Sequence, residues 1–219
     1  MPRRASQTED DTEDGASRAD LLADAGALAR FLQARLAALS ASPGASATPS
    51  LPGTPRAAGV LLPLYARAAQ PYLLFTRRAP TLSAHSGEIS FPGGSRDATD
   101  PTLTSAALRE AYEELHIAPE RVAVLGQLAP VFTVVSNFLI TPVVGWLGEG
   151  PIAVEPNPGE VAEVIEAPLA ALADPAIYHM ELWARNGQQV PVYFYDLGAH
   201  RIWGATGRIL HQLLALLPA

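Results

Sequence analysis

The sequence predicts an α/β fold in which a mixed β-sheet is flanked by helices. Strand-like and helical segments follow one another irregularly from about residue 57 onward, without a repeated strand–helix–strand unit. The chain of 219 residues is long enough for one sizeable core. Its composition, 48% hydrophobic and 17% charged, is close to that of ordinary globular proteins. We therefore expect one folded domain with an extension at the N-terminus.

The first quarter of the chain divides into three parts by composition. Residues 1–17 are acidic and polar without apolar periodicity, which is typical of a disordered tail. Residues 18–41 carry leucine and phenylalanine at helical spacing, and this predicts an N-terminal helix that packs on the main body as an extension. Residues 42–56 are rich in Pro, Ser and Gly and are interpreted as a linker. The tail lacks the apolar segment of a signal peptide, so we expect a cytoplasmic protein.

Residues 57–219 form the predicted domain, which begins with two strands. These are expected at residues 57–65 and 71–78, and the intervening "ARAAQ" favours a hairpin. Further strands are predicted near residues 121–128, 137–146, 160–167, 177–183 and 191–197, followed by a closing helix at residues 205–217.

A second helix is predicted after "FPGGSRDATD", whose two glycines and turn-forming residues indicate a loop. Pro101 is suited to the first helical position, behind Thr99 or Asp100 as the N-cap. The helix should extend to about Leu115.

One apolar segment, residues 122–148, contains no Asp, Glu, Lys or Arg and is long enough to cross a bilayer. Pro130, Asn137 and Pro142 interrupt it, and its Val, Thr, Phe and Ile residues favour strands. We therefore predict a pair of buried strands here and no membrane association.

Charge and cysteine content exclude several classes of function. The net charge is −7 and no run of Lys or Arg could neutralise a series of phosphates, so nucleic acid is not an expected partner. The chain contains no cysteine, which excludes disulfides, Cys-based zinc sites and thiolate nucleophiles. An anionic small-molecule substrate would need a metal ion or a few arginines.

The segment "REAYEELHI" places Glu110, Glu113 and Glu114 on one face of the predicted helix, since they are spaced at i, i+3 and i+4. The apolar side chains expected on the opposite, packed face are those of Leu108, Ala111, Tyr112 and Leu115. Such a pattern also describes an ordinary amphipathic helix with solvated glutamates. Like charges at i, i+4 and anions in the last turns of a helix are each unfavourable, however. A divalent cation would reverse both penalties, because Mg²⁺ and Mn²⁺ prefer clustered hard oxygen ligands.

The stretch "GGSRDATDPTLTSAALREAYEELHI" resembles the Nudix box, the signature of hydrolases that act on a nucleoside diphosphate linked to another group. In its usual form the box has Gly, five residues, Glu, seven residues, then Arg-Glu-apolar-x-Glu-Glu-x-Gly-apolar. This chain departs from it in having Asp100 at the first Glu, eight residues before Arg109, and His116 at the last Gly.

The resemblance implies a Nudix-type α/β/α sandwich and a requirement for Mg²⁺ or Mn²⁺. It implies that Glu110 and Glu114 are the main metal ligands, that Glu113 lies near or in the metal cluster, and that the Gly94 carbonyl is a further ligand. Arg109 would orient the site by pairing with carboxylates and holding the loop.

A second pattern, "LLFTRRAPTLSAHSGEISFPGG", resembles the additional motif of the coenzyme A pyrophosphatase branch of the Nudix family. Thr76, Arg78, His85, Gly87 and the segment from residue 91 to 94 stand in corresponding places, whereas Leu82 occupies a position that often holds Arg. The resemblance covers roughly residues 57–217 and implies hydrolysis of coenzyme A or its derivatives to 3′,5′-ADP and (acyl-)phosphopantetheine. Another Nudix substrate, such as ADP-ribose or a dinucleotide, and a catalytically silent binding module remain the alternatives.

Several charged residues are candidates for binding and catalysis. Arg77 or Arg78 could clamp a phosphate with two hydrogen bonds, and His85 and Gly87 are assigned to substrate binding. Glu160, on a Pro- and Gly-rich loop, is the favoured general base. The competitors for this role are Glu163 and Glu113. The remaining isolated histidines, His179, His200 and His211, are interpreted as structural. The sequence does not indicate an oligomeric state.

Overall fold

The computed structural model describes residues 16–41, 53–80, 87–185 and 187–219. Most of the predicted tail and linker, as well as His85, therefore lie outside the described residues.

The centre of the molecule is a mixed sheet of eight strands. Its main path has the order β3-β2-β1-β7-β5, with β4 paired to β1, β6 to β7 and β8 to β2. Only β1 and β7 are parallel among the described pairs of this sheet. The strands are β1 (Arg56–Arg67), β2 (Gln70–Arg78), β3 (Ile89–Ser90), β4 (Gly93–Ser95), β5 (Ala123–Gln127), β6 (Val131–Thr133), β7 (Phe138–Glu149) and β8 (Val161–Pro168).

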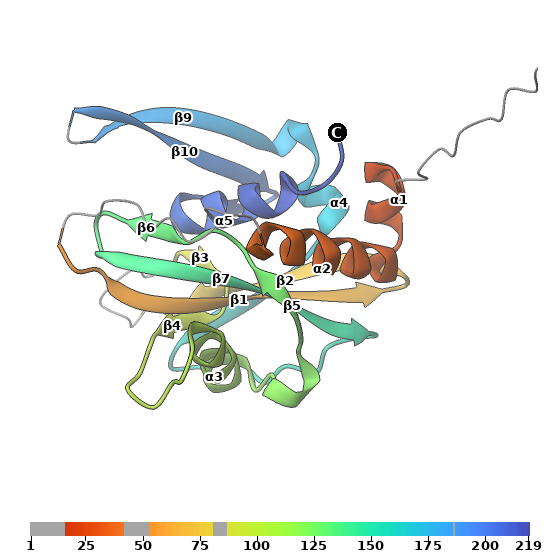
Figure 1. Cartoon of the computed structure of the whole chain (residues 1–219), viewed down its shortest axis with the longest axis horizontal. Coiled ribbons are helices and arrows are strands. Elements are labelled where there is room, and N and C mark those ends of the chain that lie inside the picture. Colours follow the sequence, from red (N-terminus) through yellow and green to blue (C-terminus); the bar gives the residue numbers. More distant parts are fainter. Residues whose placement is uncertain (1–15, 42–52, 81–86, 186) are drawn as a thin grey trace, which may run out of the picture.

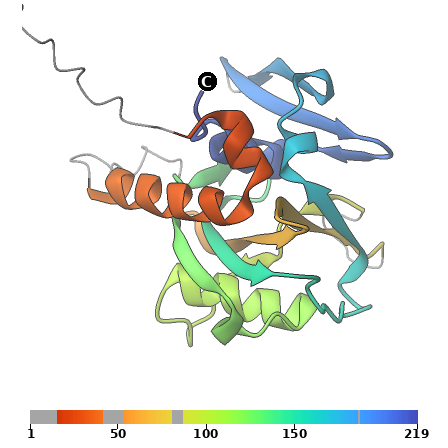
Figure 2. The ribbon, with the colours of Figure 1, turned by 90° about the vertical axis from the view of Figure 1, so that its right-hand side faces the viewer.

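Helices cover both faces of this sheet. Helix α3 (Leu103–Leu115) lies on one face, and α2 (Ala25–Ala41) and α5 (Gly204–Leu214) lie on the other (Figure 1, Figure 2). The short elements are α1 (Arg18–Ala23), α4 (Leu169–Leu172) and the 3-10 turns η1 (Pro119–Arg121) and η2 (Pro175–Ile177). The arrangement confirms the predicted α/β/α sandwich with an N-terminal helical part.

A separate sheet of three strands lies beyond α5. It consists of β9 (Tyr178–Arg185), β10 (Gln188–Leu197) and β11 (His200–Ile202), in the order β11-β10-β9. In Figure 1 the β9–β10 hairpin lies above α5, on the far side from the main sheet.

Two apolar clusters hold the layers together, one on each side of the sheet. The larger joins α2 and α5 to the sheet through residues such as Leu32, Leu73 and Leu210, all fully buried. The smaller joins α3 to the sheet through residues such as Leu61 and Leu115. The N-terminal helices thus share one core with the domain. Burial of their leucines removes apolar surface from water, which stabilises this packing.

The segment 122–148 forms strands, but three of them, β5, β6 and β7, where a pair was predicted. No described helix is long and apolar enough to span a membrane. The single helix predicted for residues 18–41 is interrupted at Asp24, which has extended backbone angles and accepts a hydrogen bond from the amide of Ala27 (2.9 Å). The side chain of Asp24 thereby caps α2. The closing helix ends at Leu214, and the residues after it form turns.

The predicted start of the second helix, Pro101, was wrong by two residues. Thr102 is the N-cap of α3, and it forms a capping box with Ser105, while Pro101 precedes the helix. The hydroxyl of Thr102 accepts from the amide of Ser105 (3.0 Å), which satisfies one of the unpaired donors at the helix start. Asp100 is thus free to pair with Arg109 (Nη2 to Oδ2, 3.0 Å).

The predicted buried face of α3 was also wrong in part. Tyr112 is 48% exposed and packs edge-on against His116, whereas Glu114 is only 4% exposed. The face that meets the sheet is formed by small residues, Ala107 and Ala111, together with Leu115. This rotation of the helix brings one carboxylate into the protein interior.

Candidate active site

Close packing of α3 against β1 places the glutamate face of the helix over the sheet. A Cβ atom on Gly59 of β1 would collide with the carbonyl oxygen of Leu103 and lie 3.0 Å from the amide of Ala107. Only glycine allows this approach of helix and strand. The site therefore depends on small residues in both elements.

Glu114 is the most deeply buried acidic group of α3. Burial raises the pKa of Glu114 to about 8, and the charges of Glu110 and Glu160 act in the same direction. Arg78 and the backbone of Gly93 oppose this rise. The Oε2 atom of Glu114 has no hydrogen-bond partner among the described residues. A buried carboxylate oxygen without a partner is costly, so the site is suited to a bound cation.

Glu110 lies one turn earlier, against the backbone of β4. A Cβ atom on Gly94 would be 2.5 Å from Cδ of the Glu110 carboxylate, so a side chain here would displace that carboxylate. Burial raises the pKa of Glu110, although Arg109 lowers it. The structure thus brings together the predicted ligands Glu110, Glu114 and Gly94. In the sequence, only the resemblance to the Nudix box indicated that Gly94 lies near these glutamates.

Arg109 is held by carboxylates on both sides. Its guanidinium donates to Asp100 (Nη2 to Oδ2, 3.0 Å), to Glu113 (Nη1 to Oε2, 2.9 Å) and to the carbonyl of Ser95 (3.0 Å), and it also pairs with Glu110 (3.0 Å). The hydrogen bond from Arg109 holds the pKa of Asp100 below its usual range. Arg109 thus connects the loop before α3 to the helix. Glu113 is half exposed and its carboxylate is paired with Arg109.

The loop that precedes β8 brings Glu160 to the same place. This loop is anchored to the end of α3, because the amide of Asn157 donates to the carbonyl of Glu114 (2.8 Å) and the amide of Glu155 donates to that of Leu115 (3.0 Å). The Glu160 side chain accepts from the Asn157 amide group (3.3 Å) and lies near enough to raise the pKa values of Glu110 and Glu114.

The competing glutamate, Glu163, belongs to a different group of side chains. It pairs with Arg77 (2.8 Å) and with His200 (3.0 Å). A bulge in the pairing of β2 with β8 separates the partners of Arg77 and Arg78. Successive strand residues point to opposite faces, so Arg77 is engaged with Glu163 while Arg78 acts on Glu114. His200, interpreted as structural and isolated, is therefore a hydrogen-bond partner of Glu163.

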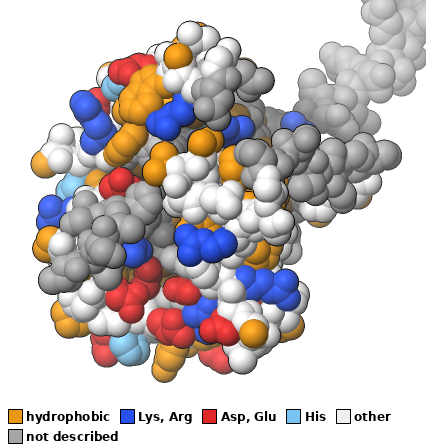
Figure 3. Space-filling view, turned by 90° about the vertical axis from the view of Figure 1, so that its left-hand side faces the viewer, with side chains coloured by type: hydrophobic (Ala, Val, Ile, Leu, Met, Phe, Trp, Pro, Cys, Tyr) orange, Lys and Arg blue, Asp and Glu red, His pale blue; other side chains and the backbone are white. Residues whose placement is uncertain are grey.

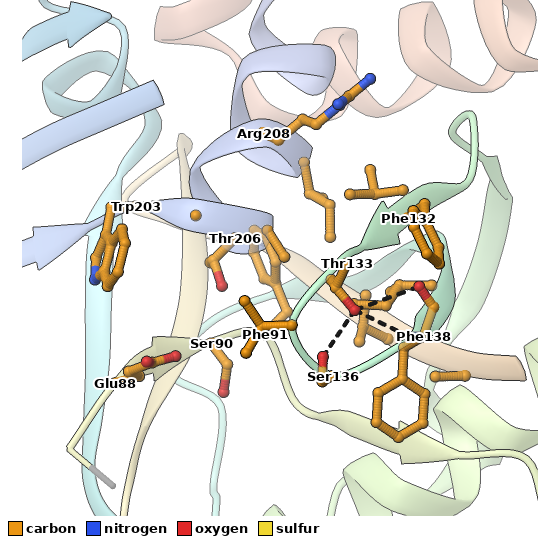
Figure 4. A pocket seen from close by; sticks show the side chains of 18 of the residues that line it. Glu88, Ser90, Phe91, Phe132, Thr133, Ser136, Phe138, Trp203, Thr206 and Arg208 are labelled. Atoms are coloured by element: carbon orange, nitrogen blue, oxygen red, sulfur yellow. Dashed lines mark hydrogen bonds between the residues drawn. The ribbon is translucent and has the colours of Figure 1, made fainter. Parts of the chain in front are cut away.

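Arg78 also borders a pocket of about 610 Å³ that opens beside Gly93 and Gly94. The Nε atom of Arg78 is buried and has no hydrogen-bond partner in the described part of the chain. Trp203 lies on one side of the pocket, and Phe132 and Phe138 lie on the other (Figure 4). Glu and Asp side chains interspersed with basic ones gather on the lower part of this face of the molecule, towards α3, while hydrophobic side chains gather above them (Figure 3).

The donor set suits a divalent cation. Glu110 and Glu114 provide hard oxygen atoms, one of them unpaired and buried, and Glu160 adds negative charge nearby. Within the described residues no three acidic or histidine side chains converge tightly enough to form a metal site by themselves. Mg²⁺ is commonly held by one or two carboxylates, with water and substrate phosphates completing its shell, and an open site of this kind fits that pattern.

Two sequence predictions concern the segment before β3. Gly87 has a φ of +72°, a conformation that favours glycine, and it makes a backbone hydrogen bond to Arg78 (3.2 Å). The space around its Cα is open, since no described atom lies within 4 Å of a Cβ built there. His85 lies outside the described residues.

Asp100 and His200 were not among the predicted site residues. A signal for Asp100 was present, because it occupies the position at which the Nudix box has its first Glu. No signal in the sequence connected His200 with Glu163, since their contact depends on β11 lying against β3.

Comparison with known proteins places this arrangement in a family. A family model described as the NUDIX domain matches residues 54–186. The sequence is 46% identical over 158 residues to an uncharacterized Nudix hydrolase NudL of Photorhabdus laumondii subsp. laumondii, a match that covers 72% of this chain and 83% of that protein. The corresponding protein of Pectobacterium atrosepticum is 43% identical over 159 residues, with 72% and 81% covered.

A MutT/nudix family protein from Enterococcus faecalis has a similar fold, with a TM-score of 0.52 and 15% identity over 86% of this chain and 72% of that one. The chain therefore belongs to the Nudix family of hydrolases, which cleave phosphorus anhydrides.

Proposed function

We propose that this Nudix hydrolase cleaves the diphosphate of coenzyme A or its derivatives, giving 3′,5′-ADP and (acyl-)phosphopantetheine. The observation that carries the proposal is the apolar pocket that adjoins Arg78, Gly93 and Gly94, next to the carboxylates of α3. Coenzyme A joins a nucleotide to a long, weakly polar arm through a diphosphate, so it matches a charged site that continues into an apolar one. The motif from residue 73 to 94 gives independent support by resemblance.

The diphosphate would lie over α3, with Glu110 and Glu114 holding Mg²⁺ or Mn²⁺ and the Gly94 carbonyl contributing a further oxygen. A divalent cation held there supplies positive charge against the diphosphate and lowers the pKa of the attacking water. Water adds to one phosphorus, the bond from that phosphorus to the bridging oxygen breaks, and the other phosphate leaves with that oxygen. Both products are phosphate monoesters.

Glu160 is the proposed general base. Its carboxylate is near Glu110 and Glu114 and has only one described hydrogen bond, a long one of 3.3 Å from Asn157. The competitors have stronger partners, since Glu163 pairs with Arg77 and His200, and Glu113 pairs with Arg109. A carboxylate that accepts few hydrogen bonds is better placed to take a proton from water.

Two arginines have different proposed roles. Arg78 would bind a phosphate oxygen, because its buried Nε has no described partner and it borders both the carboxylates and the pocket. Arg109 would position Glu110 and the loop of Gly94, because its donors are already used by Asp100, Glu113 and Ser95. Arg77, which pairs with Glu163, is the weaker candidate for the substrate.

The test is a panel of diphosphates incubated with the protein and Mn²⁺, with separation of the products. Coenzyme A, ADP-ribose and NADH are compared, each with and without a chelator. We expect coenzyme A to give 3′,5′-ADP at the highest kcat/KM, and the chelator to abolish the reaction. Preferential cleavage of ADP-ribose or NADH would contradict the proposal, and no cleavage of any substrate would indicate a binding module.

A further inference from the structure

We infer that the pocket beside the carboxylates receives an aliphatic acyl chain, so that the preferred substrates are acyl thioesters of coenzyme A and not the free thiol. The inference rests on the proposed function and specifies the substrate class of the same site. The pocket shares Arg78, Gly93 and Gly94 with the charged site, so a molecule bound at the carboxylates can continue into it without leaving the protein surface.

The walls of the pocket are aliphatic on three sides. Val131 and Ile140 come from the main sheet, Val192 comes from β10, and Ile209 comes from α5. These residues belong to elements that are far apart in the sequence, so the pocket is lined by the β9–β10 hairpin, by α5 and by the main sheet together. Figure 1 shows the hairpin and α5 on the same side of that sheet. An alkyl chain between these walls would be removed from water on several sides.

Most hydroxyl groups of the walls are engaged within the chain. Thr133 Oγ1 lies 2.8 Å from Ser136 Oγ (Figure 4). Thr206 Oγ1 donates to the carbonyl of Ile89 (3.0 Å). Ser90 Oγ lies 3.3 Å from the hydroxyl of Thr76. A nucleobase read by hydrogen bonds needs free donors and acceptors, whereas an alkyl chain needs none. The engaged hydroxyls therefore favour an apolar occupant.

The rim of the pocket exposes apolar side chains to water. Val134 is 50% exposed, Val135 is 78% exposed and Trp203 is 36% exposed. Single exposed apolar residues are common, but three around one opening form a patch that a ligand could cover. Arg185 and Arg208 also border the pocket, and Figure 4 shows Arg208 extending from α5 away from Thr206 and Phe91.

The first experiment measures kcat/KM for coenzyme A and for its acetyl, butanoyl, hexanoyl and octanoyl thioesters. Each methylene that enters the pocket should raise kcat/KM by up to about fourfold, which corresponds to ~0.8 kcal/mol per buried methylene. We expect octanoyl-coenzyme A to exceed acetyl-coenzyme A by at least tenfold. Equal values for all chain lengths, with coenzyme A still cleaved, would overturn the inference and leave the proposed function intact. Failure to cleave any of them, with cleavage of ADP-ribose, would overturn the proposed function itself.

Three variants locate the effect in the pocket. Ala205→Leu adds bulk to the α5 wall, and the double variant Val134→Ser with Val135→Ser removes the apolar rim. Val124→Ser is the matched control, because Val124 is a 39% exposed strand residue on β5 that does not line the pocket. The readout is the ratio of kcat/KM for octanoyl-coenzyme A to that for acetyl-coenzyme A, with the thermal midpoint of each preparation as a test of folding.

We expect the ratio to fall at least fivefold in the filled variant and in the rim variant, and to stay within twofold of the wild type in the control. Since the rim residues are exposed, their substitution should leave the fold intact even if Ala205→Leu does not. An unchanged ratio in the folded rim variant would overturn the inference.

Discussion

Helices α2 and α3 pack on opposite faces of the same sheet but bury different kinds of side chain. On α2 the buried residues are Ala25, Leu28, Ala29, Leu32 and Leu36, all apolar. On α3 they are three alanines, a leucine and the carboxylate of Glu114. Large apolar side chains stabilise a helix on a sheet, whereas alanines permit close approach at the expense of buried area. The comparison indicates that α2 contributes mainly to stability and α3 mainly to the site.

The largest expected effect concerns stability and comes from α2. Leu32 is fully buried in the larger apolar cluster, so Leu32→Ala should lower the free energy of unfolding by about 3 to 5 kcal/mol through lost burial and a cavity. The kcat of the remaining folded protein should stay within about twofold, because Leu32 does not line the site. Urea unfolding and active-fraction kinetics measure both quantities. A large fall in kcat at unchanged stability would contradict the assignment of α2 to stability.

On α3 the corresponding experiment is Glu114→Gln, which keeps the side-chain size but removes the charge. Turnover should fall a hundredfold or more, about 2.7 kcal/mol at the transition state, because a metal ligand is lost. The free energy of unfolding without metal should stay equal or rise, because burial disfavours the charged form that this carboxyl group has in the unfolded chain at pH 7, and glutamine has no charged form. Glu120→Gln makes the same change at an exposed position of η1 and serves as the control. Unchanged turnover of Glu114→Gln at saturating Mg²⁺ would rule out the metal site.

A smaller effect is expected where the loop before α3 joins the helix. Asp100→Asn places an amide opposite the guanidinium of Arg109 and should cost about 2 kcal/mol of stability at pH 7, as for a hydrogen bond to a charged group. Since the folded-state pKa of Asp100 is lowered, its contribution is fully present above its unfolded pKa of about 3.9. It is lost as the pH falls through the lower folded-state value.

The measurement is urea unfolding of wild type and Asp100→Asn from pH 7 to about pH 3, with Asp97→Asn as the control. Asp97 is exposed, and its carboxylate accepts only a long hydrogen bond from Thr99 (3.4 Å) among the described contacts of its side chain. The stability difference between wild type and Asp100→Asn should shrink on acidification. A difference that is constant over this range would show that the Arg109 pair does not depend on the charge of Asp100.

Much of the difference between α2 and α3 could be predicted from the sequence, because both are long segments with helical periodicity. The leucine spacing of residues 18–41 predicted helix and the glutamate spacing placed Glu110 and Glu114 on one face. The burial of Glu114 was not predictable, since helix periodicity defines relative faces but not which face meets the sheet. That choice depends on Gly59, from a strand far away in the sequence, which admits alanines and excludes Tyr112.

The boundaries of helices and short strands were harder to predict, because periodicity does not define them either. Pro101 predicted the start of α3, but the reciprocal hydrogen bonds of Thr102 with Ser105 place the N-cap after it. Strands β3, β4 and β6 have two or three residues each, too few for periodicity to show. The register shift between β2 and β8, at Arg77 and Arg78, also has no marker in the sequence.

The smallest expected effect concerns the C-terminus of α3, where His116 stands at the position of the last glycine in the Nudix box. His116 has a φ of +55°, a conformation that costs a non-glycine residue about 1 kcal/mol. Its Nδ1 atom lies 2.8 Å from the carbonyl of Glu155, a hydrogen bond that contributes about 1 kcal/mol and ties the Glu160 loop to the helix. His116→Gly removes both effects, so its free energy of unfolding should stay within about 0.5 kcal/mol of the wild type by cancellation.

His116→Ala removes the hydrogen bond but keeps the backbone cost, and it should be less stable than His116→Gly by about 1 kcal/mol. Urea unfolding of the three proteins measures the order. Equal stability of the alanine and glycine variants would show that the left-handed conformation is not retained in the alanine variant.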